Sequence, residues 1–436
     1  MKALTTRVPV ALGMLLCPLF ALAQSAAPVP VADTGDTAWI IAATALVLFM
    51  TLPGLALFYG GLVRSKNVLS ILMQCFAITG VVSLLWLAVG YTLVFSDGGS
   101  AQPFIGSLDK AFMLGVARDA VTGTIPETVF FMFQMTFAII TPALVIGGFA
   151  ERKRFSAVLG FTVLWLLIVY VPLAHWVWGG GWLAKLGVMD FAGGIVVHVS
   201  AGVSALVCAL VLGHRRGFPH TAMTPHSLPV TATGAGMLWV GWFGFNAGSA
   251  LAANGSAGMA MLTTHMGASA GALAWMFIEW KKYGKPSMLG VVTGVVAGLG
   301  TITPASGFVG PLGAVVIGLT AGTVCFFATQ FLKRKLAIDD SLDVSPVHGV
   351  GGVIGTLLTG VFAAAALGGT GFPVQTSIGA QVGVQAIGVA AAIAWCGSGT
   401  WLILKLIKVF TGLRVSEEKE TEGLDLAEHG ERGYSP

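Results

Sequence analysis

Charged residues are scarce in this chain. Only 10% of its 436 residues are Asp, Glu, Lys or Arg, whereas a soluble domain carries about 25%. Hydrophobic residues make up 56% of the sequence, and the mean hydropathy is +0.86. This balance excludes a soluble globular protein and indicates a polytopic membrane protein in a lipid bilayer. The net charge of +4 comes from basic residues scattered over several loops, so we expect no nucleic-acid partner.

Motifs of enzymes and metal centres are also lacking. The sequence contains neither a phosphate-binding G-x-x-x-x-G-K-[ST] loop nor an H-E-x-x-H zinc motif. It has five cysteines and no C-x-x-C pair, so small apolar packing residues are their default interpretation. Two histidines, His198 and His348, have no third ligand at metal-binding spacing. We therefore expect no metal, no cofactor and no enzymatic activity.

The first 23 residues have the pattern of a secretory signal peptide. Lys2 and Arg7 give a basic start, an apolar run follows, and small residues precede a cleavage position near Ala23. A short first membrane helix is the alternative, but prolines leave too few residues for a span of about 20. We expect residues 24–36 to form a periplasmic segment after cleavage.

Long apolar runs fill most of the remaining chain. Each is close to the roughly 20 residues that a membrane helix needs, and together they predict an all-α domain over residues 37–410 with about eleven transmembrane helices. The expected limits are 37–62, 68–95, 125–149, 155–177, 190–213, 228–248, 256–279, 287–304, 307–332, 344–367 and 379–410.

The distribution of Lys and Arg predicts the orientation. Basic clusters such as residues 152–154 and 333–335 fall in every second loop, whereas the other loops hold only Lys110, Arg118 and Lys185. Since cytoplasmic loops carry the excess of positive charge, the mature N-terminus should be periplasmic and the C-terminus cytoplasmic. Residues 411–436 then form a cytoplasmic tail, either a disordered end or a docking element for a regulator.

Two ionisable pairs lie in apolar surroundings. Asp190 and His198 are eight residues apart, and eight residues of α-helix rise about 12 Å, from the edge of a membrane towards its midplane. Asp340 and His348 repeat this spacing. For one such pair, a structural role explains the residues as well as a functional role does: the Asp would cap a helix, and the His would bond to a neighbouring helix. A second occurrence favours two histidines that line a shared pore.

The positions of these pairs predict a repeat. The chain crosses five apolar spans from the first pair to the second. Because five is odd, the two pairs should enter the membrane from opposite faces. Gly202 and Gly352 follow the two histidines at the same offset. This is the pattern of an inverted repeat of five plus five helices, here with one final helix and one pore per subunit.

Aromatic residues form a second candidate site. Phe133 and Phe137 are four residues apart, which places both on one helix face. Interfacial anchoring and packing explain many such residues. The functional interpretation is a cation site, because a desolvated aromatic face attracts a cation. Trp178 and Phe137 would supply the rings, Ser249 would accept a hydrogen bond, and Asp190 would provide negative potential or hold the loop backbone.

At these residues the chain resembles the ammonium transporters (Amt), which are related to the yeast ammonium permeases and the animal Rhesus proteins. The resemblance covers essentially the whole mature chain, and Trp178 favours the Amt branch. The matching segments are F-Y-G-G-L (58–62), A-E-R-K-R-F (150–155), W-G-G-G (178–181), D-F-A-G-G-I-V-V-H (190–198), G-W-F-G-F-N-A-G-S (241–249) and V-H-G-V-G-G (347–352).

The resemblance implies a role for each candidate residue. Trp178, Phe137 and Ser249 would form the outer ammonium recruitment site, with Asp190 as an essential carboxylate close by. Phe137 and Phe245 would be the stacked rings that gate the pore, with Phe133, Gln134 and Trp242 in their neighbourhood. His198 and His348 would be hydrogen-bonded to each other, and their complementary tautomers would let them relay a proton.

The resemblance also implies partners and a location. We expect a homotrimer in the bacterial inner membrane that transports ammonium as ammonia plus a relayed proton. G-L-R-V (412–415) and E-G-L-D (422–425) in the tail favour docking of a PII-type nitrogen-signalling protein at the cytoplasmic face. Two alternatives remain at this point: a membrane-embedded ammonium sensor, and a neutral channel for ammonia or carbon dioxide.

Overall fold

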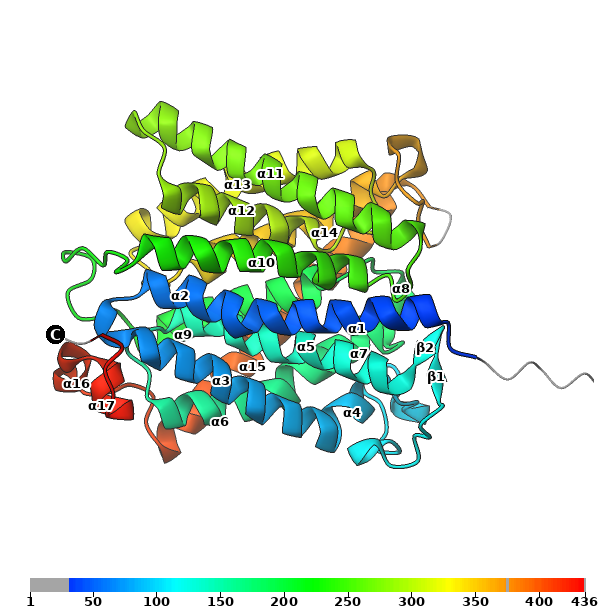
Figure 1. The fold of residues 1–436 in the computed structure, drawn as a ribbon, viewed down its shortest axis with the longest axis horizontal. Coiled ribbons are helices and arrows are strands. Elements are labelled where there is room, and N and C mark those ends of the chain that lie inside the picture. The colour runs from blue at the N-terminus through cyan, green and yellow to red at the C-terminus, as the bar shows by residue number, and fades with distance from the viewer. Residues whose placement is uncertain (1–30, 374–375, 435–436) are drawn as a thin grey trace, which may run out of the picture. The chain divides into compact units, whose positions relative to one another are not determined.

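The structure, a computed structural model, describes residues 31–373 and 376–434. The expected signal peptide therefore lies outside the described residues. In the unit formed by residues 32–436, long helices run side by side, and the strands of the described residues are one short hairpin (Figure 1). Its strands, β1 (Val121–Thr122) and β2 (Ile125–Pro126), pair antiparallel.

The helices of the first half are α1 (Thr34–Phe49), α2 (Ala56–Leu62), α3 (Val68–Leu85), α4 (Tyr91–Phe95), α5 (Glu127–Val145), α6 (Phe155–Trp165), α7 (Val171–Trp178), α8 (Trp182–Leu186) and α9 (Ser200–Leu212). Those of the second half and the tail are α10 (Leu228–Gly248), α11 (Gly255–Tyr283), α12 (Met288–Ile302), α13 (Pro311–Gln330), α14 (Gly351–Phe362), α15 (Ile378–Phe410), α16 (Glu417–Glu422) and α17 (Leu424–His429).

The expected all-α membrane fold is confirmed. Among the described residues, eight helical stretches are long and apolar enough to cross a membrane. α10, α11 and α12 occupy the other three expected spans. α12 is a shorter apolar helix of 15 residues, whereas α10 and α11 are long enough but rich in Gly, Ala and Thr.

Wider π-helical turns lie within, or at one end of, several of these stretches, and the first of them contains a kink at Leu52. They lie at Met50–Leu55, Trp86–Gly90, Leu166–Tyr170, Gly194–Val199, Phe331–Lys335 and Ser345–Val350. Two of the turns carry His198 and His348. The helix of the first pair therefore begins at Gly194 rather than at Asp190, and its first turn is not α-helical. Such turns are frequent at functional sites, because the local widening reorients side chains.

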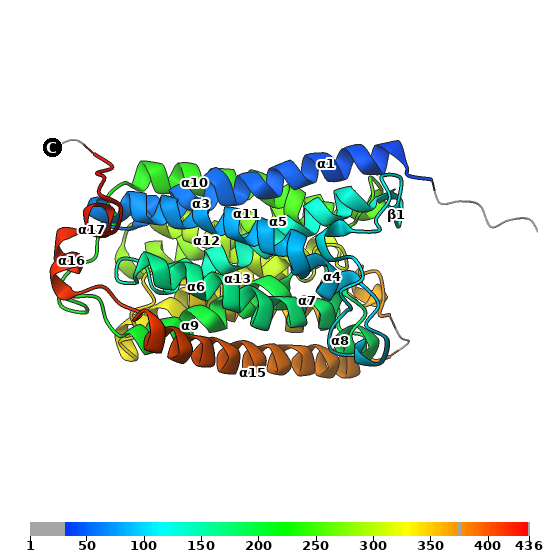
Figure 2. The same cartoon turned by 90° about the horizontal axis from the view of Figure 1, so that it is seen from below.

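The two ends of the bundle are distinct. We call the end that carries Trp178, α8 and the hairpin the outer end, and the end that carries Arg152 and the tail the inner end, following the orientation expected from the basic loops. α16 and α17 lie at the inner end, opposite α8 and β1, in both views (Figure 1, Figure 2). The described part of the tail is therefore folded rather than a free end.

Glycines explain how the two histidine-bearing segments approach each other. A Cβ atom at Gly202 would clash with the backbone of Gly349. A Cβ atom at Gly352 would lie 3.0 Å from the Cβ atom of His198. These are the two glycines that follow the histidines at the same offset in the sequence. Small residues at such crossings let helix backbones come close, and here they bring His198 and His348 together.

Candidate functional site

A cavity of about 270 Å³ opens at the outer end. Its walls include the three residues expected to recruit a cation, Trp178 at the end of α7, Phe137 on α5 and Ser249 just after α10, and also Gln134. The rings of Trp178 and Phe137 meet edge to face, with centroids 5.8 Å apart. The Ser249 hydroxyl donates to the carbonyl oxygen of Phe245 at 2.9 Å, which leaves its oxygen free to accept a hydrogen bond.

Asp190 holds the loop that borders this cavity. Its carboxylate is buried and accepts hydrogen bonds from the backbone N–H groups of Gly193, Gly194, Ile195 and Val196, at 2.6 to 3.2 Å. Its carbonyl oxygen accepts the indole N–H of Trp178 at 3.0 Å. Asp190 therefore caps the helix of His198 and fixes the Trp178 ring.

Two rings that were expected to stack, those of Phe137 and Phe245, close the bottom of the outer cavity, with their planes tilted by 36°. The centroids of Phe137 and Phe245 are 4.3 Å apart, and each side chain is only 1% exposed. Phe133 packs against Phe137 from the same helix, with centroids 5.0 Å apart, and is fully buried. Trp242 lies beyond Phe245, where its indole N–H donates to the Thr303 hydroxyl at 2.9 Å. An ion cannot pass these rings unless they move.

The histidine pair lies beyond these rings. The Nδ1 atoms of His198 and His348 are 3.2 Å apart, and the ring of Trp242 stacks on His198 at 5.5 Å. One Nδ1 must carry a proton and the other must accept it, so the two rings are in complementary tautomers. A narrow cavity of about 10 Å³ beside them has otherwise apolar walls, including Ile140, Leu238 and Val296. That volume is at the lower limit for one water molecule.

The two Asp–His segments are built alike. Five residues after each Asp, a backbone N–H donates to its carboxylate: Ile195 to Asp190 at 2.8 Å, and Ser345 to Asp340 at 2.6 Å. The first carboxylate lies towards the outer end and the second towards the inner end. This is the arrangement that the inverted repeat predicts.

A second cavity, of about 290 Å³, leads from His348 to the inner end. In contrast to the outer cavity, it has several charged walls, among them Glu279, Lys333, Arg334 and Asp343. Lys333 and Asp343 form an ion pair of 2.7 Å. The order along the molecule is thus an aromatic cavity, the two rings of Phe137 and Phe245, a buried histidine pair and a polar cavity.

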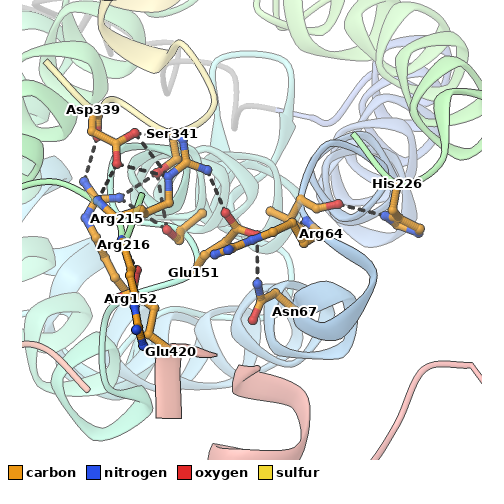
Figure 3. A network of polar contacts seen from close by, with 12 residues as sticks. Arg64, Asn67, Glu151, Arg152, Arg215, Arg216, His226, Asp339, Ser341 and Glu420 are labelled. Atoms are coloured by element: carbon orange, nitrogen blue, oxygen red, sulfur yellow. Dashed lines mark hydrogen bonds and ion pairs between the residues drawn. The ribbon is translucent and has the colours of Figure 1, made fainter. Parts of the chain in front are cut away.

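A buried ionic network ties the inner ends of several helices together (Figure 3). Arg215 binds Glu151 at 2.6 Å and Asp339 at 2.7 Å, and all three side chains are at most 5% exposed. Burial raises the pKa of Glu151, but Arg215 and Arg64 more than offset it and hold that pKa at about 2. Burial also raises the pKa of Asp339, but its hydrogen bonds and ion pair with Arg215 outweigh burial, and the pKa of Asp339 is lowered.

Arg152 connects this network to the second Asp–His segment. Its guanidinium donates to the Ser341 hydroxyl at 2.6 Å and to the Asp339 carbonyl oxygen at 2.7 Å, on either side of Asp340. Burial, with a contribution from Asp343, raises the pKa of Asp340 to about 6.

The tail docks on the same end. Asp425 accepts hydrogen bonds from the backbone N–H groups of Leu69 and Ser70. Glu420 accepts one from the N–H of Arg216 and pairs with Arg414. Both acids lie in or next to the segment 422–425 that the sequence singled out.

Sequence reasoning missed the inner ionic network. Glu151 was visible only as part of a motif in a basic loop, and Asp339 only as the neighbour of Asp340. An acid inside an otherwise basic loop, and two adjacent acids after a basic cluster, are signals that could have indicated buried pairing.

Comparisons with known proteins agree with one another. A family model described as "Ammonium Transporter Family" matches residues 38–434. An ammonium transporter of Aquifex aeolicus is 49% identical, covering 92% of this chain and 94% of the relative, and one of Bacillus subtilis is 47% identical, covering 92% and 98%.

Solved structures are similar as well. Saccharomyces cerevisiae Mep2 has a TM-score of 0.82 at 39% identity and covers 89% of each chain. A structure described as "Sensor Amt Protein" has a TM-score of 0.84 at 33% identity, over 91% of this chain and 98% of the other.

Proposed function

Because this chain belongs to the ammonium transporter family, we propose that it binds ammonium at its outer cavity, removes a proton, and conducts ammonia past His198 and His348 while these histidines relay the proton. The observation that carries this proposal is the order of the site: an aromatic cavity, a pair of closely packed phenylalanine rings and a buried histidine pair follow one another on one path.

Recruitment rests on the aromatic walls. The faces of Trp178 and Phe137 attract a cation by about 0.5–2 kcal/mol each, depending on how far it is desolvated. The free lone pair of Ser249 accepts one N–H of ammonium. The capped carboxylate of Asp190 adds negative potential without being a wall of the cavity.

Deprotonation follows from the apolar path beyond the rings. Moving a bare ammonium ion into this segment costs far more than the aromatic faces return. Neutral ammonia has no such penalty, so it is the species that passes Phe137 and Phe245. The proton moves separately through the histidine pair: one proton adds to the Nε2 atom of His198, the proton between the two Nδ1 atoms shifts to His348, and the Nε2 proton of His348 leaves towards the inner cavity.

Reconstituted protein tests this function. Liposomes that contain the protein should give a saturable current after a jump in ammonium, whereas a potassium jump and empty liposomes should give none. His198→Leu and His348→Leu should each abolish the ammonium current, and His220→Leu, which removes an exposed loop histidine, should not. Unchanged current in both pore variants would overturn the relay. A pH change inside the liposomes without current would indicate net passage of ammonia instead.

A sensor is the second candidate function. Its support is the similarity to a protein described as a sensor, together with the tail folded onto the inner end. Under this alternative, ammonium binds and changes the tail, but neither current nor internal pH changes. The relatives named above as transporters favour transport.

The proposal extends to a trimer. His265 lies on α11, near the middle of a helix in the membrane, and its exposed ring packs against the ring of Trp239, with centroids 5.3 Å apart. A polar ring facing lipid is costly, so a second copy of the chain covers this face. We place the trimer in the bacterial inner membrane, with the N-terminus periplasmic after signal cleavage, and a PII-type protein would bind the cytoplasmic inner end, next to the tail.

A further inference from the structure

Two glutamines lie buried in the last membrane helix, away from the pore. Gln381 and Gln385 are 2% and 0% exposed on α15. A buried amide in a membrane helix is costly unless all its polar atoms are bonded. Neither residue belongs to the recruitment site, the rings of Phe137 and Phe245 or the histidine pair.

The amide of Gln385 clamps one backbone position at two points. Its Oε1 atom accepts the N–H of Met189 at 2.8 Å, and its Nε2 atom donates to the carbonyl oxygen of Met189 at 2.7 Å. The same Nε2 atom donates to the Thr356 carbonyl oxygen at 3.1 Å. Gln381 supports the clamp by donating to the carbonyl oxygen of Gly187 at 3.0 Å.

Met189 directly precedes Asp190, on which two elements of the outer site depend. The Asp190 carbonyl oxygen holds the indole of Trp178, and the Asp190 carboxylate caps the turn that carries His198. A shift of Met189 would therefore move the recruiting ring and the cap together. An error of about 0.5 Å is enough to weaken a preorganised site.

The inner repeat holds its loop in a different way. The residues on either side of Asp340 are fixed by the guanidinium of Arg152, a cation. A cation in the corresponding outer position would repel the ammonium ion that the outer cavity attracts. A neutral amide provides both a donor and an acceptor without adding positive charge.

We propose that Gln385 is a positioning residue of the outer cation site. It sets the geometry of Trp178 and Asp190 from α15, through the backbone of Met189. This inference rests on the proposed function, since it concerns the affinity of the site for ammonium.

The test compares two substitutions in the liposome assay. Gln385→Leu keeps the approximate shape but removes every hydrogen bond, and leaves the Met189 backbone groups unpaired. We expect the half-saturating ammonium concentration to rise by about tenfold. A purely structural role would lower the amount of folded protein and the maximal current, but not the apparent affinity.

Gln385→Glu provides a rescue that depends on pH. A protonated carboxyl has one donor and one acceptor and can replace the amide on Met189, whereas an ionised one has no donor. Burial favours the protonated form. The affinity of this variant is compared with that of the wild type at each pH. It should equal the wild-type affinity at acidic pH and fall to that of Gln385→Leu as the pH rises.

Gln74→Leu is the matched control. Gln74 is also buried, but among the described residues its amide nitrogen donates only to the Ser70 hydroxyl of its own helix, so the affinity of this variant should not change. Wild-type affinity in Gln385→Leu, or a Gln385→Glu variant that binds as weakly as Gln385→Leu at every pH, would overturn the inference while ammonium current in the wild type upholds the function. Absence of current in the wild type would instead reject the proposed function itself.

Discussion

A single residue, Trp178, both lines the outer cavity and bonds to the loop beside it. Its ring faces the outer cavity, and its N–H fixes it to the Asp190 carbonyl oxygen. Trp178→Leu should raise the half-saturating ammonium concentration by about 2- to 30-fold, because one cation–π contact of about 0.5–2 kcal/mol is lost. Current measured against ammonium concentration checks this. Trp395→Leu, which removes an exposed tryptophan of α15, should leave the affinity unchanged.

Lys153 is a buried charge at the inner end. Its Nζ atom lies 4.0 Å from the ring centroids of both Phe149 and Phe161 and has no hydrogen-bond partner among the described residues. Burial lowers the pKa of Lys153 to about 8, from an ordinary value near 10.5. The protonated amine therefore destabilises the fold below pH 8, and this penalty disappears as the pH rises from 8 towards 10.5.

Lys153→Met should stabilise the protein at neutral pH. We expect the free energy of unfolding in detergent micelles to rise by about 1–3 kcal/mol, less than the full pKa shift implies because two cation–π contacts are lost as well. The gain should shrink above pH 8. Lys335→Met, at an exposed lysine, should change little. A less stable Lys153→Met protein would show that the aromatic clamp outweighs the cost of burial.

The sequence predicts the residues that the structure brings together at the candidate site, but it does not predict the residues that support them. Asp190 and His198 show their relation through a short, repeated spacing. Arg215 and Asp339 are 124 positions apart, and Gln385 is 196 positions from Met189. No local pattern links residues at such separations, because only the packing of the helices brings them together.

The tail shows how much an element depends on its surroundings. α16 and α17 have six residues each, too few to be stable alone. Asp425 anchors α17 through hydrogen bonds to two backbone N–H groups of α3. Asp425→Ala should release the tail, since charge-assisted hydrogen bonds contribute about 1.5–3 kcal/mol each.

Limited trypsin digestion would detect this release. Cleavage near Lys419 should become faster in Asp425→Ala than in the wild type, whereas Glu417→Ala, at an exposed acid of the same tail, should be cut at the wild-type rate. Equal cleavage of all three proteins would mean that Asp425 does not hold the tail.

Long helices were predictable from the sequence, because a long apolar segment in a membrane must form its backbone hydrogen bonds within itself. α15 begins at Ile378 and ends at Phe410, against expected limits of 379 and 410. The π-helical turns and the folded tail were not predictable, because both depend on contacts with distant parts of the chain rather than on local periodicity.

At the scale of the whole molecule, two buried acids at the inner end affect the stability of the fold in opposite ways as the pH falls. Glu151, with a pKa of about 2, stabilises the fold above its unfolded value near 4.5 and loses that contribution as the pH falls towards 2. Asp340, with a pKa of about 6, destabilises the fold when ionised and is relieved as the pH falls from 6 towards 3.8. Stability in detergent should therefore rise from pH 7 to about 4.5 and fall below it.

Unfolding measured across this range, with variants, separates the two acids. Asp340→Asn should remove the rise, and Glu151→Gln should weaken the fall while lowering stability at neutral pH by about 3 kcal/mol. If the stability of the wild type decreased steadily from pH 7 downward, Asp340 and Glu151 would not have opposite effects on the fold.

The two cavities also determine where a membrane voltage acts. Each has room for several water molecules. Because water has a much higher dielectric constant than protein, the electric field inside the two cavities is weak. Most of the voltage drop therefore falls between the rings of Phe137 and Phe245 and His348. One charge crossing 100 mV gains about 2.3 kcal/mol. Recruitment of ammonium in the outer cavity would then be almost independent of voltage. The proton that crosses between the two histidines would carry nearly all of the electrical work.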